Sequence, residues 1–307
     1  MQKVRLATRS SRLALWQANE VAARLLEKGV ECEIVPVRSA GDIDLVNPIY
    51  EMGVQGVFTR ELDIALLNND ADIAVHSLKD VPVITAKGTM VAAVLPRADV
   101  RDVLIYKGKI PGNDKFIVAT SSVRRRSQWL ERFPNHETDN IRGNVETRIQ
   151  KLNESNFDGL IMARAAIDRL GMQLPFLQNL DWMLPAPGQG AIAIACRHDD
   201  KQVLNKIVKV NHRHSFIEVQ AERDFLHELK GGCSAPISAH AVINNNDIMF
   251  TGAVHSIDGK QSFRVKRTFG ERDFSNAGRY CAQEVLNSGE GRSILEHIFR
   301  SRPELGA

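Results

Sequence analysis

The sequence predicts an α/β protein with two α/β domains and a C-terminal α+β domain. Short apolar runs alternate with amphipathic helical patterns in the first third of the chain, and the same alternation restarts after about residue 100. After about residue 237 several strand patterns follow one another with turns and no helix between them. The chain has 307 residues, of which 43% are hydrophobic and 25% charged, so it can build a core in two or three domains.

The first third of the chain reads as βαβ units. Strands are predicted at residues 3–9, 32–39 and 71–78, and helices at residues 12–29 and 56–70. Apolar side chains share one face of the first helix at Leu15, Ala18, Ala22 and Leu25. Gly29 suits the C-terminal cap of this helix, and Thr59 is a candidate N-cap for the second. Strands that alternate with helices in this way predict a parallel sheet.

The remaining elements complete two further regions. Strands are predicted at residues 115–121 and 157–165, and helices at residues 122–133 and 144–154. A Pro/Gly loop within residues 184–197 leads into a strand that could return to the first domain. In the last region a helix is predicted at residues 215–229, antiparallel strands over residues 238–269 with turns at 244–247 and 258–259, and a C-terminal helix from about Ser275.

Composition narrows the classes of function. The chain has 40 Lys and Arg against 37 Asp and Glu, a net charge of +3, which by itself indicates neither nucleic acid nor a membrane as partner. Aromatic residues make up 6%, and Trp129 is the only one near the arginine-rich run, which disfavours nucleic-acid binding. We find no signal-peptide core and no apolar run of membrane-spanning length. The four cysteines form no metal-ligand spacing, so we expect a reduced cytoplasmic protein without a metal.

Basic side chains gather where predicted strands end and helices begin. They are Arg9, Arg12, Lys79, Arg124, Arg125, Arg126, Arg142, Arg148 and Arg169. In open α/β sheets ligands bind at the carboxyl ends of strands, and helix N-termini favour anions. One such arginine is usually a solvated surface charge, but so many at equivalent places predict a cleft between two α/β domains that holds a polyanion.

Asp80 is the acidic residue that stands out, because it follows a buried strand beside Lys79. It is either a turn aspartate before a proline-containing loop or a carboxylate at the mouth of a cationic cleft. In the second case we expect it ionised, where it would stabilise a positive intermediate rather than serve as a standing proton donor. His76 on the same strand is interpreted as a neutral core histidine.

Cys233 follows Gly231 and Gly232 in a stretch without a regular-structure pattern. Three readings stay open on the residues alone: a buried structural thiol, an activated nucleophile, or the attachment point of a prosthetic group. The two glycines favour access to the thiol.

Six motifs together resemble those of the porphobilinogen deaminase (hydroxymethylbilane synthase) family. They are ATRSSRLALWQA, AVHSLKDVP, TSSVRRR, IRGNVETR, PAPGQGA and ELKGGCSAPI, in the family's order and spanning residues 9–237. The resemblance implies two periplasmic-binding-protein-like α/β domains around a hinged cleft and a C-terminal α+β domain. It also implies an enzyme that joins four porphobilinogen molecules into linear hydroxymethylbilane with loss of ammonia. The domain limits we predict are 1–96 with 190–212, then 97–189, then 213–307.

The resemblance also implies roles for single residues. Cys233 would carry a dipyrromethane cofactor through a thioether, and Asp80 would hydrogen-bond pyrrole N–H groups and stabilise the cation left by ammonia. Because each pyrrole bears an acetate and a propionate, a growing chain needs a cationic site. The residues implied as carboxylate ligands are Arg9, Ser11, Lys79, Ser122, Arg124, Arg125, Arg142, Arg148 and Arg169. Gln17 and Gln189 are implied as residues near the rings.

The chain departs from the family pattern in its lid segment. Glu51 and Gln55 stand where the family has lysines, and Ala166 stands where it commonly has glycine. We expect Glu51 to point to solvent or the lid to close differently. The competing hypothesis is a non-catalytic clamshell protein that binds acidic small molecules, with no covalent adduct and no need for Asp80. By family resemblance we expect a monomer.

Overall fold

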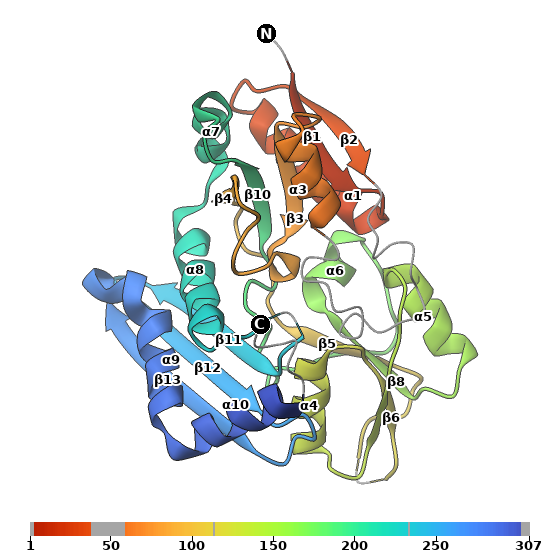
Figure 1. Cartoon of the computed structure of the whole chain (residues 1–307). Helices are drawn as coiled ribbons and strands as arrows, with labels where there is room; N and C mark the ends of the chain where they lie inside the picture. Colours follow the sequence, from red (N-terminus) through yellow and green to blue (C-terminus); the bar gives the residue numbers. More distant parts are fainter. Residues whose placement is uncertain (1–2, 38–58, 113, 233, 302–307) are drawn as a thin grey trace. The chain divides into compact units, whose positions relative to one another are not determined.

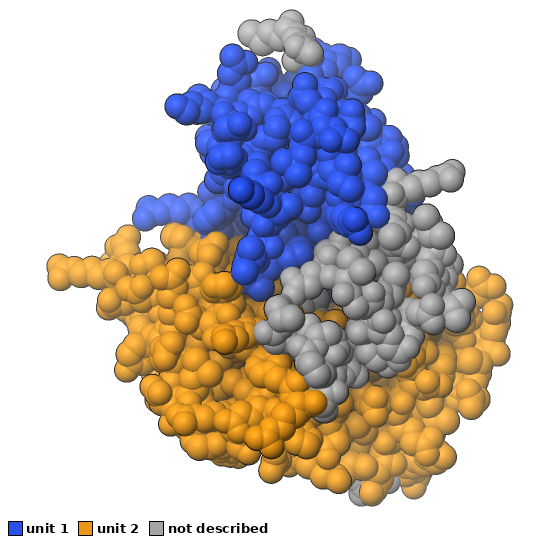
Figure 2. Space-filling model, in the orientation of Figure 1, with its two compact units in different colours: residues 1–45, 54–98, 190–216 blue, residues 46–53, 99–189, 217–307 orange. Residues whose placement is uncertain are grey.

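The structure is a computed structural model that describes residues 3–37, 59–112, 114–232 and 234–301 (Figure 1). The chain divides into two compact units, coloured separately in Figure 2. Unit 1 contains residues 1–45, 54–98 and 190–216, and unit 2 contains residues 46–53, 99–189 and 217–307. Among its described residues the chain therefore passes between the units after residues 98, 189 and 216. The predicted division into three domains stays a prediction.

Unit 1 is built on a mixed five-stranded sheet of order β2-β1-β3-β10-β4. Its strands are β1 (Val4–Arg9), β2 (Cys32–Val37), β3 (Ile73–Ser77), β4 (Thr89–Val94) and β10 (Ile192–Arg197). Its helices are α1 (Arg12–Leu26), α3 (Arg60–Leu67) and α7 (Lys201–Ile207), with 3₁₀ turns η2 (Leu78–Asp80) and η3 (Val208–Val210). The predicted strands and helices of this region are confirmed, and Thr59 occupies the N-cap position of α3.

The parallel arrangement predicted for the first three strands is confirmed, but the complete sheet of this unit is mixed. β1, β2 and β3 are parallel, but β10 runs antiparallel to both β3 and β4. The reason is where the chain re-enters the sheet. Ala191 accepts a hydrogen bond from Leu78, so β10 starts beside the end of β3 and must run back along it. The predicted return of this strand to the first domain is confirmed.

Side chains alternate between the two faces of this sheet, as a strand requires. Leu6 packs with Val21 and Leu25 of α1, whereas the adjacent Ala7 packs with Leu62 and Leu66 of α3. The sheet is therefore the middle layer of three, with helices on both faces.

Unit 2 contains a second sheet of order β7-β6-β8-β5-β9. Its strands are β5 (Asp102–Tyr106), β6 (Ile117–Ala119), β7 (Glu137–Asp139), β8 (Gly159–Ala163) and β9 (Leu177–Asn179), and its helices are α4 (Val123–Arg132), α5 (Val145–Glu154) and α6 (Arg164–Arg169). As in unit 1, three parallel strands in the order second, first, third lie beside an antiparallel strand. The prediction of two α/β sheets of one kind is thus confirmed.

The C-terminal part of unit 2 is α+β, as predicted. β11 (Ile237–Asn244), β12 (Asp247–His255) and β13 (Ser262–Gly270) form an antiparallel sheet, with α8 (Arg213–Glu228), η4 (Glu271–Asn276), α9 (Ala277–Asn287) and α10 (Gly289–Ser301). Both predicted turns are present, with positive φ at Asn245 and Gly259. The single predicted C-terminal helix is two helices, because Ser288 is extended and its Oγ accepts the Gly291 N–H at the start of α10.

Glu131 at the end of α4 joins this helix to the C-terminal sheet. Its carboxylate accepts hydrogen bonds from Ser262 Oγ at 2.6 Å and Arg264 Nη2 at 2.9 Å, and lies 3.2 Å from the Nε2 atom of the buried His255. The contact with His255, followed by those with Ser262 and Arg264, lowers the pKa of Glu131 to about 2, against the opposing effect of burial.

We expect Glu131→Gln to lower the free energy of unfolding by about 1–2 kcal/mol near neutral pH, because it leaves Arg264 without its counter-charge and weakens the hydrogen bonds that the carboxylate accepts. The folded carboxyl has the lower pKa, so its contribution is present above pH 4.5 and is lost as pH falls toward 2. Chemical denaturation at several pH values measures the difference. Glu137→Gln is the control, because its ion pair with Lys115 is exposed. A constant difference from pH 7 to pH 2.5 would contradict the assignment.

Candidate active site

In unit 1 the sheet brings Arg9, Lys79 and Asp80 to one edge. Arg9 is the last residue of β1, and η2, which follows β3 directly, contains Lys79 and Asp80. β1 and β3 are parallel neighbours, so their carboxyl ends meet at the same edge. All three residues are half-buried. A carboxylate and two cations therefore lie at the edge where open α/β sheets bind their ligands.

The turn that carries Asp80 is anchored through Leu78. The Leu78 side chain is buried, its N–H donates to the Ala191 carbonyl, and its carbonyl accepts the N–H of Val81. These contacts hold the backbone of η2 on both sides of Asp80. The sequence presents Asp80 on a fixed turn because an apolar residue precedes Lys79 and a proline follows Val81.

Gln17 lies beneath this turn, on α1. The side chain is 2% exposed, its Nε2 donates to Ser77 Oγ at 2.9 Å, and its Oε1 lies 3.2 Å from the same hydroxyl. Gln17 thus contacts the residue that immediately precedes η2. Its role near the rings stays a prediction.

His76 is the buried core histidine that the sequence predicted. Burial, with a smaller contribution from the charge of Arg9, lowers its pKa to about 4. The ring is therefore neutral at neutral pH, which confirms the interpretation of the sequence.

Ser11 and Ser122 both occupy N-cap positions. Ser11 Oγ accepts the Ala14 N–H at the start of α1, and Ser122 Oγ accepts the Arg125 N–H at the start of α4. A hydroxyl that accepts at a cap keeps its own hydrogen for donation. Each serine can therefore cap its helix and donate to a carboxylate at a positive helix end.

In unit 2 the remaining basic residues follow three parallel strands. Arg124 and Arg125 follow β6 together with Ser122, Arg142 and Arg148 follow β7, and Arg169 follows β8. The loops after β6 and β7 are tied together, because Ser121 Oγ donates to the Ile141 carbonyl and accepts its N–H. This tie brings the two groups of arginines to one end of the sheet.

Two of these loop residues are further held by main-chain contacts. Arg148 Nε donates to the Gly143 carbonyl at 2.8 Å, and Lys151 Nζ donates to the Arg142 carbonyl at 3.1 Å. The side chain of Arg142 is buried. The RGN segment is thus fixed by the helix that follows it.

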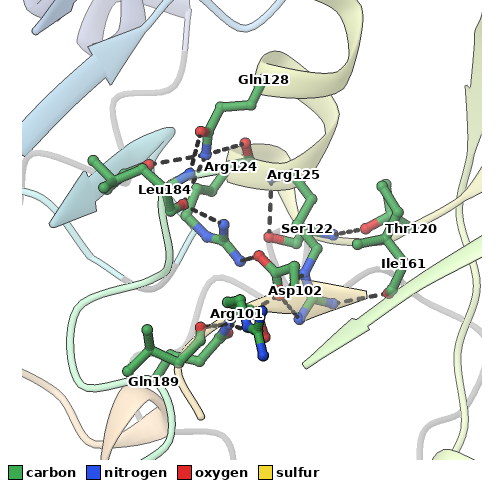
Figure 3. Close-up of polar contacts among 12 residues, drawn as sticks. Arg101, Asp102, Thr120, Ser122, Arg124, Arg125, Gln128, Ile161, Leu184 and Gln189 are labelled. Carbon is green, nitrogen blue, oxygen red and sulfur yellow. Dashed lines mark hydrogen bonds and ion pairs between the residues drawn. The ribbon is translucent and has the colours of Figure 1, made fainter. Parts of the chain in front are cut away.

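Arg124 and Arg125 are buried against a single carboxylate, Asp102 (Figure 3). Arg124 Nη2 lies 2.8 Å from Asp102 Oδ2, and Arg125 Nη2 lies 2.8 Å from Oδ1. Asp102 is 0% exposed, and the two arginines are 4% and 6% exposed. Burial lowers the pKa of Arg124, and the neighbouring charge of Arg125 lowers it further, whereas Asp102 opposes both. The sequence predicted the arginines but not this arrangement.

Gln189 and Gln128 complete the surroundings of this cluster. Gln189 is fully buried, and its Nε2 donates to Asp102 Oδ1 at 2.9 Å and to the Val100 carbonyl at 2.7 Å. Gln128 Nε2 donates to the Leu184 carbonyl (Figure 3). It also donates to Ser238 Oγ of β11. Gln189 was predicted near the rings, and that role stays a prediction.

Sequence reasoning missed Asp102. The sequence does indicate it, because a charged residue stands at the start of the otherwise apolar strand DVLIY. A carboxylate buried at such a position needs a cationic partner, and the arginines of α4 were the obvious candidates.

Several predicted residues lie outside the described residues. They are Cys233, Glu51 and Gln55. The other three cysteines are described, and burial raises the pKa of Cys32 and Cys196 to about 11 and that of Cys281 to about 12. Since the thiolate is the reactive form, these three thiols are poor nucleophiles at neutral pH.

The described parts of the chain contain neither a metal-binding cluster nor a membrane-spanning helix. No group of three or more His, Cys, Asp or Glu side chains there could hold a metal ion. None of the helices described combines the length and the apolar character needed to cross a membrane.

Comparison with known proteins gives matches along nearly the whole chain. Residues 4–205 match the family model "Porphobilinogen deaminase, dipyromethane cofactor binding domain", and residues 216–287 match "Porphobilinogen deaminase, C-terminal domain". These two models define a class of protein in which a cofactor-binding region precedes a separate C-terminal domain. The chain belongs to the porphobilinogen deaminase family.

Curated relatives and solved structures were also found. The porphobilinogen deaminases of Syntrophomonas wolfei and Syntrophobacter fumaroxidans are each 40% identical, over 96% and 97% of this chain and 98% of each relative. Among solved structures, the periplasmic VFT2 domain of Bordetella pertussis BvgS is similar with a TM-score of 0.42 and 13% identity, over 67% of this chain and 86% of that one.

Proposed function

We propose that this protein joins four porphobilinogen molecules into hydroxymethylbilane with release of ammonia, on a covalently bound dipyrromethane primer, in tetrapyrrole (heme) biosynthesis. The observation that carries the proposal is the family match over residues 4–205 and 216–287. It favours the transferase over the non-catalytic binder of acidic small molecules. Each of the four head-to-tail couplings would break the C–N bond of the substrate's aminomethyl group, release one ammonia, form a carbon–carbon bond to the acceptor pyrrole and release the hydrogen of that carbon as a proton. Water would then cleave the finished chain from the primer and supply its hydroxyl group.

The residues of unit 2 fit an anionic cofactor. Arg124 and Arg125 share one carboxylate, and the Nε of Arg124 is buried with no hydrogen-bond partner among the described residues. A carboxylate-bearing group would balance the surplus charge and satisfy such a donor. When bound, a dipyrromethane supplies the pyrrole carbon to which the first substrate is joined. Ser122, Arg124 and Arg125 would hold its carboxylates.

In unit 1 we assign the chemistry to Asp80. An ionised carboxylate at the carboxyl end of β3 can accept hydrogen bonds from pyrrole N–H groups and stabilise positive charge on the substrate as ammonia leaves. Lys79 and Arg9 at the same edge would bind substrate carboxylates, and Ser11 would donate from the N-cap of α1. Electrostatic stabilisation in a pre-formed site needs no movement at the moment of reaction.

The remaining assignments are made on motif matches. Arg142, Arg148 and Arg169 would bind further carboxylates, and Gln17 and Gln189 would act near the rings. Cys233 is the cofactor attachment point through a thioether. The high pKa values of the other three thiols support this choice. We further propose three domains with the limits predicted above, a monomer, and a cytoplasmic location.

Intact-mass measurement of the purified protein tests the cofactor. We expect the wild-type protein to be heavier than its sequence by one dipyrromethane unit, and Cys233→Ser to have the mass of its sequence alone. The matched control is Cys32→Ser, which changes a half-buried thiol and should keep the adduct. A wild-type protein at bare mass that still binds porphobilinogen would favour the non-catalytic binder.

A further inference from the structure

We propose that Asp102 is a positioning residue of this site, which holds Arg124 and Arg125 side by side and limits their surplus to one positive charge. This inference rests on the proposed function, because the arginines are assigned there to the carboxylates of the cofactor. Asp102 itself is 0% exposed and acts through the two arginines.

The carboxylate of Asp102 divides its two oxygens between the arginines. Oδ1 accepts Arg125 Nε at 3.1 Å and Nη2 at 2.8 Å, together with Gln189 Nε2 at 2.9 Å. Oδ2 lies 2.8 Å from Arg124 Nη2. Each guanidinium is thus oriented by a separate oxygen, as Figure 3 shows.

The far side of each guanidinium is held by a main-chain carbonyl. Arg124 Nη1 donates to the Leu184 carbonyl at 2.7 Å, and Arg125 Nη1 donates to the Ile161 carbonyl at 3.0 Å. The two cations are therefore clamped between a shared carboxylate and fixed backbone. Their orientation is set before any ligand arrives, so a ligand carboxylate need not order them.

Charge makes Asp102 necessary. Two guanidinium groups that are both at least nine-tenths buried repel each other in a site of low dielectric. Asp102 offsets one of the two charges and leaves one, which a ligand carboxylate can neutralise. With asparagine at this position the oxygen facing Arg125 could remain, but an NH₂ group would face the Arg124 donor.

The direction of the pKa shift of Arg124 agrees with this role of Asp102. Burial and the charge of Arg125 both lower the pKa of Arg124, whereas the charge of Asp102 and its hydrogen bond raise it. Asp102 therefore favours the charged form of Arg124 in a site that otherwise disfavours it.

The test compares Asp102→Asn with wild type in two measurements. We expect the fraction of protein that carries the cofactor adduct, read by intact mass, to fall. In the molecules that keep the adduct, we expect KM for porphobilinogen to rise by about tenfold or more, with a smaller change in kcat, since the arginines would hold the primer that the substrate must meet in ground and transition states alike. Asp99→Asn is the matched control, because Asp99 pairs with the partly exposed Arg101 and should stay within about twofold of wild type.

A double variant separates positioning from a purely structural role. If Asp102 acts through Arg124, then Asp102→Asn combined with Arg124→Gln should be no worse than the more damaging single variant. Effects on KM that multiply would overturn the inference, and so would an Asp102→Asn protein with wild-type loading and KM. If Asp102→Asn fails to fold, recovery of folding in the double variant supports the inference, and failure of both overturns it. Absence of the adduct from wild type would instead count against the proposed function.

Discussion

Replacing Asp80 by asparagine is expected to lower kcat for hydroxymethylbilane formation by about 10²–10³-fold, the cost of removing one charge-stabilising group from an active site. Asparagine has the same shape but no negative charge to stabilise the substrate cation left by ammonia. The Asp80 side chain makes no hydrogen bond to any residue in the described ranges, so we expect stability to stay within about 0.5 kcal/mol of wild type. Ammonia release and product absorbance measure the rate.

The kcat of each variant is calculated per protein molecule that carries the adduct. Intact mass gives the fraction of such molecules in each preparation. Asp70→Asn is the control, since Asp70 is an exposed carboxylate of the same unit just after α3. A kcat for Asp80→Asn within about threefold of the control would mean that charge at this turn is not used in the reaction. A large loss of stability would mean that the residue holds the turn instead.

Replacing Gly278 by alanine is expected to lower the free energy of unfolding by about 2–4 kcal/mol. Gly278 is in the first turn of α9, and a Cβ atom added there would overlap the carbonyl oxygen of Ala221 in α8. The Phe225 nitrogen lies 3.0 Å from the same Cβ position. Both obstacles are helix backbone, so α8 and α9 would have to separate. Helix propensity alone would make alanine about 1 kcal/mol more stable than glycine at this position. The expected loss of stability is therefore opposite to the effect of helix propensity.

Thermal unfolding of Gly278→Ala measures this effect, and Gly289→Ala is its matched control. Gly289 begins α10, and nothing lies within 4 Å of a Cβ atom added there. We expect the control to melt at or slightly above the wild-type temperature. Equal melting temperatures for the two variants would show that α8 and α9 are not as closely packed as their backbones indicate.

Local patterns predicted most elements of the fold. Strand β3 and helix α4 were expected because apolar periodicity and capping residues are properties of neighbouring positions. The break between α9 and α10 was missed, although Ser288 and Gly289 stand there. A serine and a glycine within an otherwise helical pattern weaken a helix without ending it, and here the Ser288 side chain caps the next helix instead.

The direction of β10 could not be predicted from its own residues. An apolar run such as IAIACR suits a buried strand of either direction. Its antiparallel course follows from the point at which the chain returns to unit 1, beside the end of β3. That point depends on the whole length of chain between residues 98 and 190.

The sequence by itself determined which residues we propose for the site, because the motifs carry Asp80, the arginines and Cys233 in a recognisable order. Only the tertiary structure decided how the arginines are used. Asp102 lies 23 residues before Arg125 and 87 before Gln189 in the chain, yet one of its oxygens contacts both. The physical reason is that the order of residues along the chain determines local conformation. The balance of buried charge depends instead on which side chains, distant in the sequence, are buried together away from water.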